Sequence, residues 1–165
     1  MATDLNIVFV DGLAMQARWE DIEFALRRTF KDAVFNDDGY TVENPIQFTR
    51  AGVDGRLGPG LKHLLALDEM GEVLGGFFCV PTQRTEGRAS CDIGWLFVVS
   101  ELDRATQRRM VDSLVQQALQ AVKEAGFERI VTNMGTLAGA KSLGQHYGFV
   151  HSPTTEKSNH WIKEL

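Results

Sequence analysis

The stretch Cys91-Asp-Ile-Gly-Trp-Leu-Phe-Val-Val99, with the long segment that follows it as far as Gly126, decides the expected fold. Residues 91–99 are rich in β-branched and aromatic side chains and predict a buried strand. After them the apolar side chains recur at helical spacing, which predicts a long helix. Its apolar face is formed by Met110, Val111, Leu114, Ala118, Leu119, Val122 and Ala125. Gly126 stands where a helix commonly ends in the left-handed conformation.

Further strands and helices are expected on both sides of this pair. The elements before it are a strand Asn6–Val10, a helix Leu13–Phe30, and two strands, 62–67 and 72–80, joined by a hairpin turn. The elements after it are a strand Arg129–Thr132, a helix Leu137–Tyr147, and short strands Phe149–Val150 and His160–Ile162. This order predicts one α/β (α+β) domain over residues 1–165, with about six to seven strands in a mixed, largely antiparallel sheet flanked by helices.

Residues 31–61 break the pattern. The run Asn36–Gly39, Pro45 and glycines 52, 55, 58 and 60 give turn chemistry throughout. A connection of this length is typical of a lid or a substrate loop. A surface connection that contains a short helix is the equal alternative.

Composition excludes several classes of protein. The chain has 165 residues, 44% of them hydrophobic and 24% charged, with a net charge of −5, so we expect no nucleic-acid or membrane partner. Its two cysteines, Cys79 and Cys91, exclude a disulfide scaffold and favour buried free thiols. The four histidines (His63, His146, His151 and His160) lack the spacing of a metal motif. Without a leader or a membrane-spanning run, a cytoplasmic location is expected.

Three motifs, in this order, resemble the GNAT superfamily of N-acyltransferases. Gly71-Glu-Val-Leu-Gly75 resembles the hairpin between the second and third strands of that family. Asp92-Ile-Gly-Trp-Leu-Phe-Val98 resembles its fourth strand, which lies beside the thioester of acyl-CoA. Leu143-Gly-Gln-His-Tyr-Gly-Phe149 resembles its helix-to-strand corner. The resemblance extends from Asn6 to Ile162.

The resemblance implies a GNAT fold and an N-acyltransferase that moves an acyl group, most simply acetyl from acetyl-CoA, onto an amine of a small molecule or a protein. Strand amides around Phe97, Val98 and Val99 would hold the pantetheine, with Asn133 as a further contact. Asp92 would take the proton of the amine; a polar strand end that faces water is the alternative. A homodimer is also implied, in which strands such as His160–Ile162 pair across a two-fold axis.

The turn that binds the CoA pyrophosphate in this family departs from the family pattern. The family uses glycine amides at the N-terminus of the central helix, a favourable place for an anion. Residues 100–111 contain no glycine. Arg104, Arg108 and Arg109 cluster there instead, and arginine matches phosphate well. The alternative is a solvated helix face that begins with Ser100 as the N-cap.

The position of the family's usual general acid, a tyrosine, falls at Gly144. The nearest substitutes are Tyr147 and His146. Two alternatives to a CoA-dependent enzyme therefore stay open: an acyltransferase that uses a carrier protein or another donor in place of CoA, and a non-catalytic domain of this fold that binds a ligand or partner.

By analogy with the family, Phe35, Tyr40, Phe48 and the glycine-rich stretch 52–60 are expected to border the acceptor pocket. The tryptophans at 19, 95 and 161 are expected to be core anchors.

Overall fold

The computed structural model describes residues 5–35, 39–134, 144, 146–152 and 160–165. Its first half consists of β1 (Asn6–Val10), α1 (Gly12–Ala17), α2 (Trp19–Phe30), α3 (Glu43–Val53), β2 (Leu61–Leu67) and β3 (Val73–Pro81). Its second half consists of β4 (Ser90–Cys91), β5 (Leu96–Val98), α4 (Arg104–Glu124), β6 (Arg129–Asn133), β7 (Val150–His151) and β8 (His160–Glu164).

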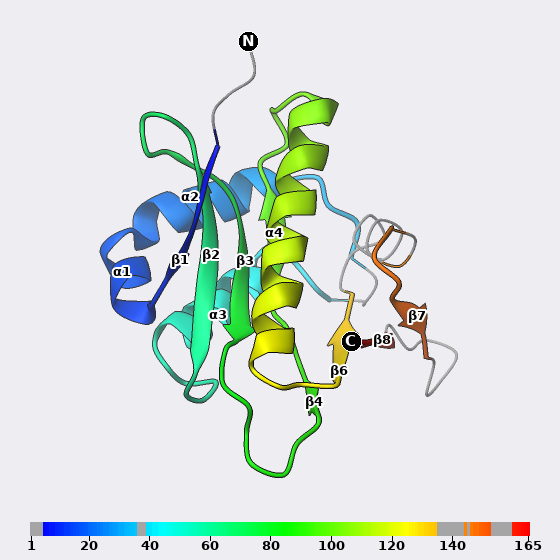
Figure 1. The fold of residues 1–165 in the computed structure, drawn as a ribbon. Helices are drawn as coiled ribbons and strands as arrows, with labels where there is room; N and C mark the ends of the chain where they lie inside the picture. The colour runs from blue at the N-terminus through cyan, green and yellow to red at the C-terminus, as the bar shows by residue number, and fades with distance from the viewer. Residues whose placement is uncertain (1–4, 36–38, 135–143, 145, 153–159) are drawn as a thin grey trace.

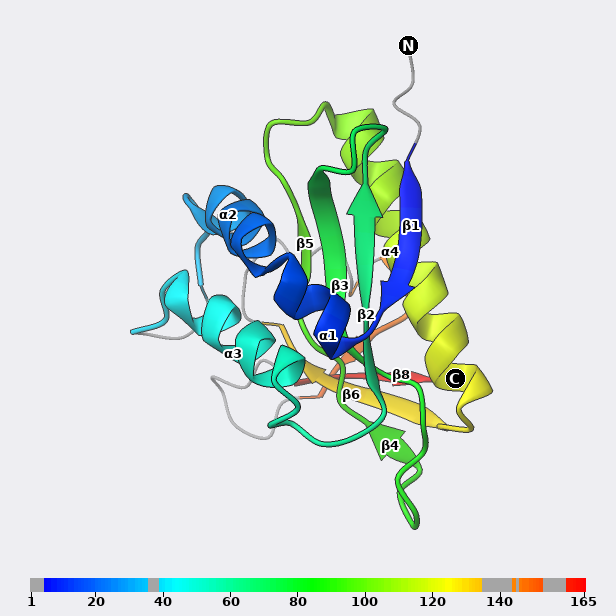
Figure 2. The same ribbon diagram turned by 90° about the vertical axis from the view of Figure 1, so that its left-hand side faces the viewer.

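The strands form two four-stranded sheets. The first has the order β1-β2-β3-β5 and is antiparallel throughout. The second has the order β4-β6-β8-β7, in which only β4 and β6 are parallel. In the first sheet α4 covers one face and α1–α3 lie on the other (Figures 1 and 2). The mixed, largely antiparallel architecture predicted from the sequence is confirmed.

The long helix α4 forms where the periodic pattern predicts it. Met110, Leu114, Ala118 and Val122 are completely buried against β3 and β5. Gly126 has φ = 93°, the left-handed conformation predicted for the residue after the helix. Neither α4 nor any other helix among the described residues is long and apolar enough to cross a bilayer.

The single strand expected over residues 91–99 is two strands in different sheets. Ser90 and Cys91 pair with β6, whereas Leu96–Val98 pair with β3. Residues 92–95 carry the chain from one sheet to the other. The apolar pattern did not predict this break, because two short strands with buried residues in succession have the same kind of sequence as one long buried strand.

One other expectation needs correction, and for residues 31–61 the structure has the alternative that contains a helix. The helix expected over Leu13–Phe30 is divided at Arg18, which has φ = −118° and ψ = 19°. The guanidinium of Arg18 donates a hydrogen bond to the carbonyl of Gly71, far along the chain. The region 31–61 contains the 11-residue helix α3, which tolerates Pro45 because proline fits the first turn of a helix. The expected helix 137–147 falls mostly outside the described residues.

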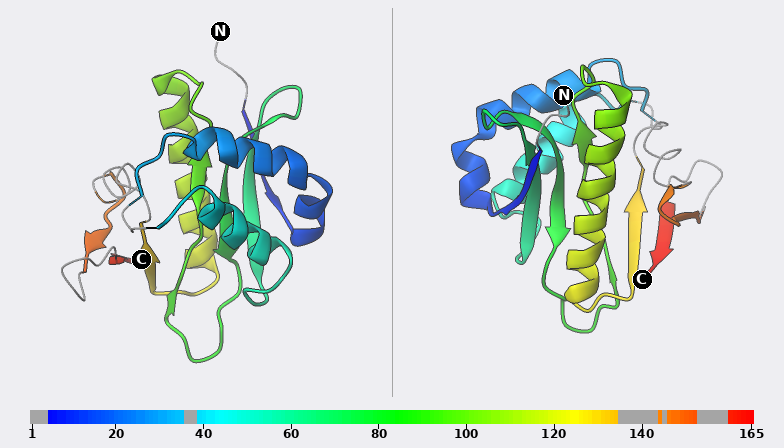
Figure 3. Two further views of the ribbon diagram at one scale, coloured as in Figure 1. Left: turned by 180° about the vertical axis from the view of Figure 1, so that it is seen from behind. Right: turned by 45° about the horizontal axis from the view of Figure 1, so that its top comes forward.

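The last strand, β8, is not an edge strand. Figure 3 (right) shows β6 and β8 side by side, next to α4. Trp161 and Ile162 pair with β6 on one side and with β7 on the other. The expected pairing of His160–Ile162 across a dimer axis is therefore wrong, because both edges of that strand are already occupied at these residues.

Candidate functional site

Strand β5 is the edge of the first sheet and forms no strand pairing with β6 among the described residues, because β6 pairs with β4 and β8. We call the place where these two unpaired strands separate the gap. The N–H of Val99 donates to the carbonyl of Leu74 (2.9 Å), and Trp95 accepts from the N–H of Phe78 (2.9 Å). Because alternate residues of an antiparallel strand turn their polar groups to the same side, residues 95, 97 and 99 face β3. The N–H and C=O groups of Leu96 and Val98 therefore point away from β3, toward the gap.

This alternation divides the three residues predicted to hold pantetheine. Phe97 is 1% exposed and stacks on Phe78 with ring centroids 5.0 Å apart, and Val99 is completely buried. Both belong to the core; the backbone groups of Phe97 and the N–H of Val99 face β3. Of the three, Val98 alone presents its backbone to the gap, and Leu96 joins it. The period-two pattern of a strand could have identified Leu96 in the sequence.

Asp103 caps the N-terminus of α4, so the expectation that Ser100 is the cap is wrong. The carboxylate of Asp103 accepts hydrogen bonds from the N–H of Thr106 (2.9 Å) and from its hydroxyl (2.6 Å). These bonds hold the pKa of Asp103 below its ordinary value. The chain's own carboxylate thus occupies the helix end where a bound anion is otherwise favoured.

Gln107 fills the inside of the loop between β5 and α4. Its side-chain amide donates to the carbonyls of Ser100 (3.1 Å) and Leu102 (3.0 Å), and more distantly to that of Val99 (3.4 Å). The loop carbonyls therefore turn inward, toward a side chain of the same helix. Sequence reasoning missed this role, and nothing in the spacing of residues 100–107 signals it.

The three arginines near the start of α4 lie at the surface. Arg109 donates weakly to the hydroxyl of Thr106 (3.5 Å). Arg104 and Arg108 lie one helical turn apart and form no ion pair with the described residues. Two guanidinium groups at this spacing can face a single anion.

Tyr147 lies against α4, and its hydroxyl donates to Asp112 (3.1 Å). Burial, followed by this hydrogen bond and the charge of Asp112, raises the pKa of Tyr147 to about 12, with Arg108 acting in the opposite sense. The phenol is therefore a weaker acid than free tyrosine. The neighbouring His146 is exposed, and its ring centroid lies 6.5 Å from that of Tyr147.

Gly144, at the position of the family's tyrosine, is backed by an aromatic ring. A Cβ atom there would lie 2.4 Å from Cζ3 of Trp161. The indole thus takes the space that any side chain at this position would need. Trp161 in turn lies 5.0 Å, centroid to centroid, from the ring of His151.

Asp92 and Asn133 both belong to segments at β6, because Cys91 pairs with Ile130 and the hydroxyl of Thr132 donates to the carbonyl of Ile93 (3.4 Å). Asp92 is exposed in the segment between β4 and β5. Burial, with a smaller contribution from the charge of Asp92, raises the pKa of the neighbouring Cys91 to about 12. Asn133 is exposed at the end of β6, paired in register with His160.

Four aromatic side chains form a chain of contacts beside the gap, on the face of the sheet that carries α2. Trp95 meets Phe30 edge-on (5.6 Å between centroids) and Phe35 edge-on (6.4 Å). Phe35 continues to Tyr40 (6.3 Å). The exposed fraction of the side chain increases along this series of rings, from 7% at Phe30 to 41% at Tyr40.

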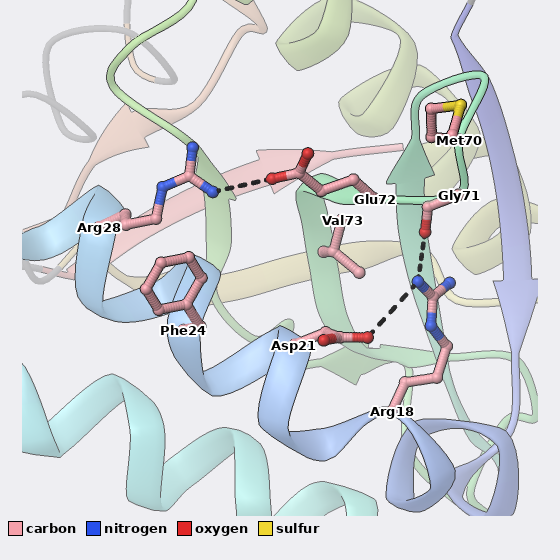
Figure 4. A pocket seen from close by; sticks show the side chains of 8 residues that line it. All are labelled: Arg18, Asp21, Phe24, Arg28, Met70, Gly71, Glu72 and Val73. Atoms are coloured by element: carbon pink, nitrogen blue, oxygen red, sulfur yellow. Dashed lines mark hydrogen bonds and ion pairs between the residues drawn. The ribbon is translucent and has the colours of Figure 1, made fainter.

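A pocket of about 410 Å³ lies between α2 and the hairpin that joins β2 to β3 (Figure 4). Arg28 crosses it and pairs with Glu72 (3.2 Å). The same guanidinium pairs with Glu101 of the β5–α4 loop (3.1 Å), and the hydroxyl of Ser100 donates to the Arg28 carbonyl (3.4 Å). Arg28 thus ties α2 to the loop at the end of the gap.

No group of three or more histidine, cysteine, aspartate or glutamate side chains that could hold a metal ion occurs among the described residues. No protein-family model matches the sequence. No curated protein matches it either.

Solved structures do resemble the chain. A GNAT family N-acetyltransferase from Escherichia coli in complex with CoA has a TM-score of 0.65 at 18% identity, covering 99% of this chain and 83% of its own. A GNAT family acetyltransferase from Brucella melitensis in complex with acetyl-CoA has a TM-score of 0.65 at 14% identity, covering 99% and 89%. A putative acetyltransferase from Salmonella typhimurium with acetyl-CoA has a TM-score of 0.56 at 18% identity, covering 99% and 94%. The resemblance drawn from the sequence is confirmed at the level of architecture: the chain has the GNAT fold.

Proposed function

We propose that this protein is an N-acyltransferase that transfers acetyl from acetyl-CoA to a primary amine by direct attack in a ternary complex. The observation that carries the proposal is that β5 and β6 do not pair, while the backbone groups of Leu96 and Val98 face away from β3 and form no hydrogen bond with the described part of the chain. The solved structures of this fold that contain CoA or acetyl-CoA support the choice of donor.

The residues present could hold acetyl-CoA, with side chains in place of the glycine amides that bind the pyrophosphate in the family. Backbone groups of Leu96 and Val98 would hold the pantetheine, and Asn133 would contact it from β6. Because Asp103 and Gln107 take up the helix end and the loop, the pyrophosphate would be held mainly by side chains. Arg104 and Arg108, with Arg109 nearby, are exposed cations in the first turns of α4 and would serve this purpose.

Bound acetyl-CoA supplies an acetyl group activated as a thioester. Asp92, directly or through a water, would take the proton from the attacking amine, so that the nitrogen forms a C–N bond as the C–S bond breaks. A backbone N–H that faces the gap would stabilise the charge that develops on the carbonyl oxygen.

The thiolate that leaves must then gain a proton. Tyr147 is a poor donor, since its hydrogen bond to Asp112 and its raised pKa both oppose release of the proton. We assign this step to His146 or to water. A thiolate is a tolerable leaving group, so the reaction does not need the family's tyrosine.

Titration calorimetry with acetyl-CoA tests the proposal, with acetyl-pantetheine as the probe that lacks the pyrophosphate. We expect micromolar binding of acetyl-CoA, weakened about ten-fold by Arg104→Ala or Arg108→Ala, since a charge-assisted contact contributes about 1.5 kcal/mol. Arg56→Ala is the matched control because Arg56 is an exposed arginine on another part of the surface. Absence of binding at millimolar acetyl-CoA would contradict the CoA-dependent mechanism.

The carboxylate of Asp103 and the filled loop favour one second candidate, a donor carried on another protein. In that case acetyl-pantetheine would bind as tightly as acetyl-CoA, and the arginine variants would leave acetyl-CoA binding unchanged. The arginines would then serve to dock an acidic carrier protein.

A further inference from the structure

From the ion pairs around Arg28, we infer that this residue positions the β5–α4 loop (residues 99–103) for the donor and keeps the carboxylate of Glu101 away from the donor's phosphates. This inference rests on the proposed function, because it concerns the same donor site. Arg28 is a positioning residue, since it acts through the loop and through Glu101 rather than by touching the donor.

The guanidinium of Arg28 holds two acidic side chains at once. Its Nε and Nη2 donate to the two carboxylate oxygens of Glu101 (3.1 and 3.2 Å), and its Nη1 donates to Glu72 (3.2 Å). The guanidinium carbon lies 5.2 Å from the ring centroid of Phe24, one helical turn earlier in α2. Most isolated ion pairs at a surface contribute little to stability, but a two-pronged pair within a network of charges contributes measurably. Arg28 therefore fixes the loop against α2 and, through Glu72, against the hairpin of β2 and β3 (Figure 4).

The β5–α4 loop is held from two sides. From α4, Gln107 donates to the carbonyls of Ser100 and Leu102. From α2, which covers the face of the first sheet opposite α4, Arg28 holds the side chain of the residue between them, Glu101 (Figure 2). The hydroxyl of Ser100 also donates to the carbonyl of Arg28 (3.4 Å). The charge of Glu101 is thus held on the α2 side of the sheet, although its backbone lies close to the start of α4.

A free carboxylate in this loop would oppose an anionic donor. The loop carries Glu101 and Asp103 directly before the cations Arg104 and Arg108. Hydrogen bonds from Arg28 hold the pKa of Glu101 below its ordinary value, so this carboxylate is ionised at neutral pH and is matched by a cation. Without Arg28 the same charge would be free to turn toward the start of α4, where it would repel phosphate. Arg28 should therefore matter for a donor that carries phosphates and not for one that lacks them.

Calorimetry with acetyl-CoA and with acetyl-pantetheine, which has no pyrophosphate, tests the inference. Arg28→Ala should weaken the binding of acetyl-CoA about five-fold and leave that of acetyl-pantetheine unchanged. Glu101→Gln should have little effect alone and should restore most of the loss in the Arg28→Ala background. Arg28→Lys should fall between Arg28→Ala and the wild type, because lysine keeps the charge and loses the two-pronged contact. Arg27→Ala is the matched control, since Arg27 is the neighbouring arginine with two ion pairs, to Glu23 and Glu43, outside the loop.

Amide hydrogen exchange of residues 99–103 provides a second readout in the absence of any donor. Arg28→Ala should raise the exchange rates of these amides about five-fold, and Arg27→Ala should not. Thermal unfolding shows whether each variant folds, and Arg28→Lys covers the case in which Arg28→Ala does not.

Three results would overturn the inference: equal effects of Arg28→Ala and Arg27→Ala, equal weakening of the two donors in Arg28→Ala, or a Glu101→Gln change that restores nothing. A wild type that binds no acetyl-CoA contradicts the proposed function together with the effect on the donor. A wild type that binds acetyl-CoA, with Arg28→Ala no weaker than Arg27→Ala, contradicts the role of Arg28 alone.

Discussion

Gly144 and Trp161 are packed so closely that a Cβ atom at position 144 would lie 2.4 Å from Cζ3 and 2.8 Å from Cη2 of the indole. Gly144→Ala should therefore lower the free energy of unfolding by about 1–3 kcal/mol, because the ring must shift to admit even a methyl group. Urea denaturation measures the loss.

The same substitution in a Trp161→Leu background provides the control. With the indole removed, the alanine should cost less than in the wild type, and the double-mutant cycle should give a coupling of about 1 kcal/mol or more. If Gly144→Ala left the free energy of unfolding unchanged, the indole of Trp161 would be able to move aside without cost. The position would then admit a tyrosine.

Asp103 should weaken the binding of an anionic donor. Asp103→Asn removes the negative charge but keeps a side chain that caps a helix. Two charges about 4 Å apart in water repel by about 1 kcal/mol, so the affinity for acetyl-CoA should rise about five-fold at low salt and less at high salt. Glu124→Gln removes the same charge at the far end of α4 and should change nothing. A lower affinity in Asp103→Asn would mean that the carboxylate organises the site.

Gln107 should determine the stability of the β5–α4 loop. In Gln107→Glu the side-chain donor becomes an acceptor that faces the carbonyls of Ser100 and Leu102. Leaving such groups without partners should cost about 2–3 kcal/mol at pH 7. Gln117→Glu, an exposed change on the same helix, should cost less than about 0.5 kcal/mol. Equal effects of the two changes in urea denaturation would contradict the role given to Gln107.

The sequence predicted the order of elements well and the site less well, for a physical reason. Helix α4 and the hairpin of β2 and β3 could be predicted because the spacing of apolar side chains within each segment is enough to identify them. The division of residues 91–99 depends on which neighbour each half pairs with, and that is decided by β6, about 40 residues later. Asp103 and Gln107 act through hydrogen bonds to the backbone, which leave no compositional trace. The arginines could be identified because their charge is unusual at the start of a helix.

Tyr147 should be dispensable for the chemistry. Tyr147→Phe removes the hydrogen bond to Asp112 and should lower stability by about 1 kcal/mol. If water or His146 protonates the thiolate, the turnover rate should change by less than about three-fold and the pH–rate profile should keep its shape. His146→Gln provides the comparison. If Tyr147→Phe alone slowed turnover by about two orders of magnitude, the phenol would be identified as the general acid.

His63 should make stability depend on pH. It is 1% exposed, and its Nδ1 accepts a hydrogen bond from the N–H of Cys79 (3.0 Å). Burial lowers the pKa of His63 to about 4, although the charge of Asp11 opposes the shift. An unfolded chain binds this proton near pH 6.5. Between about pH 6.5 and pH 4 the unfolded state therefore binds more protons than the native state, and stability falls as the pH is lowered.

The loss attributable to His63 should amount to about 3 kcal/mol by pH 4 and should level off below that pH. Carboxylates begin to titrate as the pH approaches 4, so the contribution of His63 must be isolated by comparison. His63→Asn retains an acceptor for the Cys79 N–H and removes the titration. Urea denaturation from pH 7 to pH 4 should show a shallower decline in His63→Asn than in the wild type, whereas exposed His146→Asn should follow the wild type. Parallel declines in all three proteins would mean that His63 is protonated in the native state, which would require Asp11 to outweigh the cost of burial.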